Sequence, residues 1–127
     1  EVLFIRLPNG RSIAYVQPVI MDGQISYMGL NQTTRQWTRI TTWGGKLTEN
    51  VVQSITRDCL CDTLATLEAE NFRPVMHVHD EVICEVPEDE ADARLARLKE
   101  IMATPPAWAP DIVLTADGFQ SDYYKKD

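Results

Sequence analysis

Three consecutive polar residues between two short apolar runs are the part of this sequence best suited to chemistry. His79, Asp80 and Glu81 lie within residues 74–86, and the flanking runs are rich in valine, as β-strands are. The pattern predicts a hairpin that carries two carboxylates and a histidine at its bend. Adjacent unpaired carboxylates at the tip of a buried hairpin would repel each other and lose hydration, and a divalent cation would remove that cost.

Asp80 and Glu81 are therefore candidate ligands for Mg²⁺. This ion takes hard oxygen ligands and is often held by one or two carboxylates together with substrate phosphates. Two such ions can activate the attacking oxygen and stabilise the leaving oxygen in phosphoryl transfer. Because successive strand residues point to opposite faces, we expect Asp80 to be the main ligand and Glu81 to be secondary. A solvated acidic turn is the alternative that the local pattern leaves open.

The two histidines of the chain, His77 and His79, would share one face of a regular strand. With Asp80 they approach a His-x-His-x-Asp hydrolase pattern, although Asp80 directly follows His79. Since no further histidine exists to complete a zinc shell, we assign His79 to a substrate contact and His77 to a structural place in the strand. A cation-dependent phosphohydrolase that uses residues 77–81 is an alternative hypothesis.

Gly44, Gly45 and Lys46 precede the longest amphipathic segment of the chain. Glycines at a helix N-terminus let a phosphate approach the free N–H groups, whereas a lysine there opposes the helix dipole unless an anion is present. The spacing is not that of a Walker A loop. Contact with a phosphate and a solvated lysine are both compatible with this pattern.

Two arginines, Arg35 and Arg39, flank Trp37 in a predicted strand. Such a segment could contact a nucleic-acid backbone, or it could be an ordinary strand face that carries an aromatic residue.

The remaining pattern predicts an α+β domain, with helices packed on one face of an antiparallel sheet. Residues 46–70 form the clearest helix, with apolar side chains at three- and four-residue steps and Asn71 as the stop. A second helix begins at Pro87 and is stopped by Pro105 and Pro106. Two hairpins are predicted, one over 2–16 and one that pairs 25–30 with 36–41, and Gln17-Pro18 is a turn signal between them. Near the end of the chain, residues 112–116 are predicted to form a strand and 123–127 a polar tail.

Composition is that of one globular domain. The 127 residues are 44% hydrophobic and 24% charged, and the net charge of −7 is divided into +2 for residues 1–60 and −9 for residues 61–127. The three cysteines, Cys59, Cys61 and Cys84, have the number and spacing of reduced, partly buried thiols. The absence of an apolar span or a signal peptide predicts a cytoplasmic location and no membrane partner. Glu1 is no natural start, which predicts that the chain is a piece of a longer protein.

The segment Val-His-Asp-Glu-Val at 78–82 resembles motif C of family A, polymerase I-like, DNA polymerases. Its place after a long helix, at a hairpin tip and before another helix matches the order of that family's C-terminal palm. Further segments are similar to the phage and prophage branch, and these are residues 25–29, 37–47, 49–53, 55–58, 106–109 and 117–119. Trp43 stands where this branch usually has tyrosine, and the basic residues often found near its C-terminus are partly replaced in Gln120–Tyr124.

The resemblance implies that residues 1–127 are the C-terminal palm portion of a DNA-directed DNA polymerase that acts in replication, in a bacterial or phage-infected cytoplasm. It implies that Asp80 is a catalytic ligand of Mg²⁺, with Glu81 as a less critical acid and His79 near the primer end. Gly44, Gly45 and Lys46 would then lie near the template–primer duplex. The spacing of Gln53 and Asp58 is similar to that of the family, which places Gln53 toward the duplex, although Glu49 stands where asparagine would be expected.

The same resemblance implies what the chain lacks. A second aspartate, from motif A, and the nucleotide-binding residues of a fingers helix precede motif C in this family. We therefore expect the isolated chain to be inactive, and to act on template–primer DNA and deoxynucleoside triphosphates only with the remainder of the polymerase. A noncatalytic nucleic-acid-binding prophage remnant is the other alternative.

Overall fold

The computed structural model describes residues 1–126 and confirms the α+β class. Asp127, the last residue of the predicted tail, lies outside the described residues. The chain divides into two compact units, Glu1–Ile55 and Thr56–Asp127, and the division falls inside the long helix. Antiparallel strands form two separate sheets, so the prediction of one sheet is wrong.

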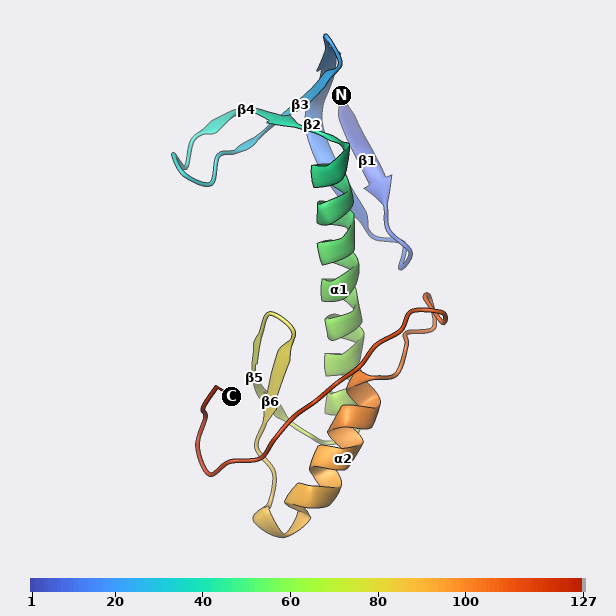
Figure 1. The fold of residues 1–127 in the computed structure, drawn as a ribbon, viewed down its shortest axis with the longest axis vertical. Coiled ribbons are helices and arrows are strands. Elements are labelled where there is room, and N and C mark those ends of the chain that lie inside the picture. The colour runs from blue at the N-terminus through green and yellow to red at the C-terminus, as the bar shows by residue number, and fades with distance from the viewer. Residues whose placement is uncertain (127) are drawn as a thin grey trace. The chain divides into compact units, whose positions relative to one another are not determined.

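The first unit contains a four-stranded antiparallel sheet in the order β1-β2-β3-β4 (Figure 1). Its strands are β1 (Val2–Arg6), β2 (Ser12–Met21), β3 (Gln24–Leu30) and β4 (Trp37–Thr42). Both predicted hairpins are therefore confirmed. Glycines at the tight turns explain two of the connections, because Gly10 and Gly23 have φ of 91° and 78°, which other residues rarely adopt.

Strand β2 is longer than the sequence indicated. Gln17 and Pro18 were expected to end it, but the strand continues to Met21. The register against β3 shifts between Val16 and Val19, and Gln17 has φ of 48°. A bulge of this kind accommodates a proline without interrupting the strand, because the bulged residue is outside the regular hydrogen-bonding ladder.

One face of the sheet carries the core of the first unit. Tyr15 is 4% exposed, and its ring meets that of Tyr27 edge to face with centroids 4.9 Å apart. The side chain of Asn50, in helix α1, donates a hydrogen bond of 3.0 Å to the Tyr15 hydroxyl. This partly buried polar contact fixes the beginning of the helix against the sheet face that bears Tyr15.

Helix α1 (Gly44–Ala69) confirms the helix predicted over 46–70, beginning two residues earlier, and it has the predicted stop at Asn71. Asn71 has φ of 61°, Phe72 N–H bonds to Leu67 O at 2.9 Å, and Asn71 N–H bonds to Glu68 O at 3.1 Å. These two bonds form a Schellman motif with asparagine at its left-handed position. The apolar stripe is less regular than predicted, since Val52 is 55% exposed.

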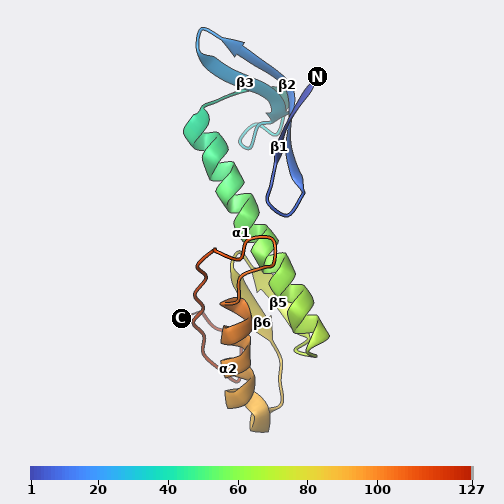
Figure 2. The ribbon, with the colours of Figure 1, turned by 90° about the vertical axis from the view of Figure 1, so that its right-hand side faces the viewer.

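The second unit packs a hairpin and a helix beside the later part of α1 (Figures 1 and 2). Its elements are β5 (Pro74–Val78), β6 (Glu81–Cys84), the short 3₁₀ turn η1 (Glu88–Glu90) and α2 (Ala91–Met102). The core consists of Leu67, Phe72 and Ile101, with Val82, Cys84 and Leu98 packed against it. The predicted central hairpin and the helix after Pro87 are thus confirmed.

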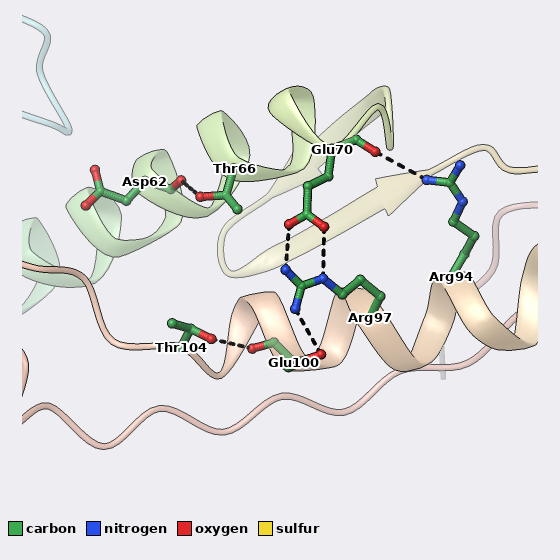
Figure 3. Close-up of polar contacts among 7 residues, drawn as sticks. All are labelled: Asp62, Thr66, Glu70, Arg94, Arg97, Glu100 and Thr104. Carbon is green, nitrogen blue, oxygen red and sulfur yellow. Dashed lines mark hydrogen bonds and ion pairs between the residues drawn. The ribbon is translucent and has the colours of Figure 1, made fainter.

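Polar contacts also join α1 to α2 (Figure 3). The Arg97 guanidinium donates to both carboxylate oxygens of Glu70, at 2.9 and 2.8 Å, and it also pairs with Glu100 at 2.9 Å. Arg94 donates to the Glu70 carbonyl and lies 5.1 Å from the centroid of the Phe72 ring. These contacts connect the C-terminal end of α1 to one side of α2.

The predicted strand over 112–116 is wrong. These residues have no regular secondary structure, and Val113 is 87% exposed. A short apolar run forms a strand only where a neighbouring strand accepts its backbone hydrogen bonds, and none pairs with it among the described residues. The described part of the predicted tail, 123–126, likewise has no helix or strand.

Candidate functional site

The predicted catalytic residues lie at the turn between β5 and β6. Val78 and Glu81 are the last paired residues, so His79 and Asp80 form the two-residue connection. His79 has φ of 53°, in the left-handed region, which histidine enters more often than most residues but at some cost. The turn therefore presents the His79 and Asp80 side chains at the end of the hairpin.

The structure of this turn differs from the sequence-based prediction in two respects. His79, Asp80 and Glu81 are all exposed, so the hairpin tip is not buried and its carboxylates remain hydrated. Asp80 is also a turn residue rather than a strand residue, so strand alternation does not choose between it and Glu81. Neither change tests the proposed roles of these residues, because exposed carboxylates can still bind a hydrated ion together with a substrate.

His77 takes a different position from His79. It pairs with Val82, which packs against the core, so both side chains lie on the sheet face directed toward the helices. Its Nδ1 atom is 3.4 Å from Nη1 of Arg57 in α1. This contact agrees with the structural place that the sequence argument gave to His77. Sequence reasoning missed Arg57, because no local pattern relates residues twenty positions apart.

The carboxylates suit only part of a magnesium site. No group of three or more histidine, cysteine, aspartate or glutamate residues within 1–126 is arranged to hold a metal ion. Asp80 and Glu81 supply hard oxygen donors of the kind that Mg²⁺ prefers, and water or phosphate oxygens would have to supply the rest. The donor set therefore fits an open, shared magnesium site and not a closed protein cage.

The predicted nucleic-acid contacts belong to the first unit. Lys46 pairs with Glu49 at 3.0 Å, with side chains 50% and 49% exposed, and Gln53 donates to the same Glu49 carboxylate at 3.2 Å. Such an exposed pair stabilises a protein by at most about 1 kcal/mol, so a phosphate could displace it. A lysine near a helix N-terminus is unfavourable without an anion, and the Glu49 carboxylate is the anion beside Lys46.

The turn before the helix is tightly packed. Helix α1 begins at Gly44, two residues before the predicted start, and a Cβ atom on Gly45 would overlap the ring of Trp43. Glycine at position 45 therefore lets the Trp43 ring lie over the first turn of the helix. Trp43 itself is 68% exposed.

Arg39 is ordered by contacts within its own sheet. Its Nη1 donates to the Gln17 carbonyl and to the Ser26 hydroxyl, both at 3.2 Å. The neighbouring strand residue Trp37 is 60% exposed. The arginine thus has a structural role at the β2 bulge and still lies on the surface.

The two groups of candidate residues lie in different units. His79, Asp80 and Glu81 belong to Thr56–Asp127, whereas Gly44, Gly45, Lys46, Arg39 and Gln53 belong to Glu1–Ile55. The structure brings the three catalytic candidates together at one turn, and it brings Lys46 and Gln53 together at Glu49.

A cavity of about 360 Å³ lies elsewhere in the second unit. It is lined by α1 residues, including Cys59, Asp62 and Thr66, and by residues 104–107. Asp62 in this lining accepts a 2.6 Å hydrogen bond from the Trp108 indole N–H. None of the hairpin candidates lines this cavity, so it is not the site that the sequence predicted.

The cysteines are free, as predicted. Burial, with smaller effects from Asp62 and Asp58, raises the pKa of the Cys59 thiol, and burial also raises the pKa of Cys84. Raised pKa values keep both thiols protonated and unreactive at neutral pH. The α1 residue Asp58 is only 6% exposed, an unusual burial for a carboxylate that the periodicity of the helix did not indicate.

Comparison with known proteins gives one informative similarity. The chain is 43% identical over 132 aligned residues to a DNA polymerase of Bacillus phage SP02, and the alignment covers 99% of this chain and 20% of that protein. The chain thus spans about a fifth of the length of the curated relative that it matches. No family model matches it, and no solved structure matches it.

This similarity supports the predicted relationship between the chain and a phage DNA polymerase. Membership of family A, the palm location and the motif C assignment stay predictions. No helix within the described residues has the length and apolar character required to cross a membrane.

Proposed function

We propose that the chain is the C-terminal palm portion of a phage-type family A DNA polymerase and that the β5–β6 turn carries its motif C. The main support is the 43% identity to a phage DNA polymerase across nearly the whole chain. The position of His79-Asp80-Glu81 at a hairpin turn, after a long helix and before another, is consistent with it. The substrates would be template–primer DNA and deoxynucleoside triphosphates.

In this proposal Asp80 holds Mg²⁺ in the intact enzyme and Glu81 assists from the adjacent position. The ion, when bound, would neutralise charge on the reacting phosphate. Asp80 suits the role because its carboxylate is exposed at a turn and can face a second protein segment and a nucleotide together. His79, held at the same turn, would lie beside the primer end.

The first unit would contribute to holding DNA. Lys46 and Gln53 lie within the first three turns of α1, and both contact Glu49. A phosphate group near Gly44 and Gly45 would take the place of Glu49 as the partner of Lys46, and the helix dipole would favour the anion. Gln53 would then be released to contact the duplex.

A segment exchange tests the proposal directly. This chain replaces the matching segment of the phage SP02 DNA polymerase, and primer extension is measured with and without Asp80→Asn. We expect the chimera to extend primers and Asp80→Asn to reduce the rate at least about 100-fold, because several kcal/mol of transition-state stabilisation depend on the metal site.

The matched control is Asp22→Asn, which removes an exposed turn carboxylate of the first unit. It should leave the rate within about threefold of the unmodified chimera, since surface substitutions of this kind have small effects. An Asp80→Asn chimera that folds and extends primers at a near-normal rate would exclude Asp80 from catalysis.

A further inference from the structure

The two edge strands of the four-stranded sheet carry the same short pattern. Phe4 and Arg6 lie two residues apart in β1, and Trp37 and Arg39 lie two residues apart in β4. Residues two apart in a strand point to the same face, so each edge strand presents an aromatic ring and a guanidinium together. The candidate functional segments of the sequence include the β4 pair but not the β1 pair.

The register places both pairs on one face of the sheet. The cross-strand partners run Val2–Val16, Val16–Met28 and Met28–Arg39, so these four side chains share a face. Phe4 is two residues from Val2 in β1, and Trp37 is two residues from Arg39 in β4. Both therefore lie on the same face as these four side chains. Tyr15, next to Val16, points to the opposite face. We call the face with Phe4 and Trp37 the outer face.

The aromatic side chains of the outer face are exposed. Phe4 is 64% exposed and Trp37 is 60% exposed, whereas Tyr15 on the other face is 4% exposed. Figure 1 shows the β1–β2 and β3–β4 hairpins extending in different directions from the row where β2 meets β3. The two aromatic–arginine pairs therefore lie on separate arms of one surface.

The charge of this region is opposite to that of the whole chain. Residues 2–42, which hold the four strands, contain four arginines and one acidic residue, Asp22, giving +3, while the other residues together carry −10. The four strands contain no aspartate or glutamate. A positive surface on an acidic protein favours an anionic partner.

Arg39 is already held in place for such a partner. Its two hydrogen bonds, to Gln17 and Ser26, both come from Nη1. A guanidinium has five N–H donors, so the Nη2 and Nε donors can still bind a phosphate. Fixing the side chain beforehand reduces the entropy that binding would cost.

We propose that the outer face binds single-stranded DNA, with bases stacked on Phe4 and Trp37 and phosphates paired with Arg6 and Arg39. Exposed aromatic rings stack on bases only when those bases are unpaired, and nearby cations bind the strand's phosphates. Under the proposed function the strand would be unpaired template or primer. The binding surface does not depend on Asp80, so either proposal can fail without the other.

Fluorescence anisotropy with the 127-residue chain and a labelled 12-nucleotide oligothymidine at low salt tests this inference. We expect Phe4→Ala or Trp37→Ala to weaken binding about tenfold and Trp37→Phe to restore most of it, because phenylalanine retains a stacking ring. Arg6→Gln should reduce the slope of log affinity against log salt by about 0.7, the value for one phosphate of a single strand. Asp80→Asn should leave binding unchanged.

Two matched controls lie in the second unit. Tyr123→Ala removes a ring that is 70% exposed, and Arg73→Gln removes a surface arginine, and neither should change the affinity. Circular dichroism melting confirms that each variant is folded. Absence of binding, equal loss in the controls, or equal affinity for a duplex would overturn the proposal. So would self-association that Trp37→Ala abolishes, which would identify the outer face as a protein interface.

Discussion

At the scale of single residues, the hairpin turn combines exposure with backbone strain. His79 occupies the left-handed region at φ of 53° without being glycine, asparagine or aspartate, and Asp80 follows it. Such strain concentrates at functional sites, where a side chain is retained for a reason other than stability. The strain at this turn is therefore consistent with the proposed role of His79.

Replacing His79 by glycine tests this strain. Glycine enters the left-handed region without steric cost but loses more backbone entropy on folding. We expect His79→Gly to leave the free energy of unfolding unchanged or to raise it by up to about 1 kcal/mol, measured by urea denaturation. Val78→Gly, in the adjacent strand position, should instead lower it by roughly 1 kcal/mol. A clear loss of stability in His79→Gly would show that the imidazole supports the fold.

At the scale of elements, helix α1 depends on partners in each unit. Its beginning is fixed by the bond between Asn50 and Tyr15, and its end by the Schellman motif at Asn71. The Glu70 and Arg97 pair then joins this end to α2. Hydrogen bonds from Arg97 lower the pKa of the Glu70 carboxyl.

The pairing of Glu70 predicts a pH dependence of stability. A carboxyl whose pKa is lower in the folded state stabilises the fold above its unfolded pKa, near 4.5, and this stabilisation disappears as pH falls through the folded value. Glu70→Gln should therefore lower the melting temperature at pH 7, and the difference from the unmodified chain should shrink below about pH 4.5. Glu68→Gln, at an exposed position of the same helix, is the control. An equal effect of both variants at every pH would contradict the role of the pair.

At the scale of the whole molecule, the candidate functions are divided between two compact units. The acids of the β5–β6 turn belong to one unit, and the positive sheet belongs to the other. One pair of adjacent carboxylates cannot by itself position two metal ions along a nucleotide triphosphate. In the proposed polymerase the second aspartate comes from outside these 127 residues.

The isolated chain should therefore fail to extend a primer even with Mg²⁺ and all four deoxynucleoside triphosphates. Gel-based primer extension with the purified chain measures this, and the chimera described above serves as the positive control. Magnesium-dependent synthesis by the isolated chain, abolished by Asp80→Asn, would show that the active site is complete within it. Tight stoichiometric Mg²⁺ binding by the chain alone would favour the phosphohydrolase hypothesis instead.

The sequence by itself determined the elements whose signals are local. The periodicity of residues 46–70 with Asn71 as the stop, and the apolar runs around His79, predicted α1 and the β5–β6 hairpin because helix and strand patterns repeat within a few residues. It also identified the acids at the turn, since charged residues between two apolar strands are visible without a fold.

Only the tertiary structure decided which of these features are buried, paired or strained. The apolar run at 112–116 is no strand because no neighbouring strand pairs with it among the described residues. Strand β2 continues beyond Pro18 because a bulge places the proline outside the regular hydrogen-bonding ladder. The contacts between Glu70 and Arg97 and between Arg57 and His77, like the shared face of Phe4 and Trp37, join residues at least twenty positions apart. Such relations depend on strand register and helix packing, which short-range sequence patterns do not encode.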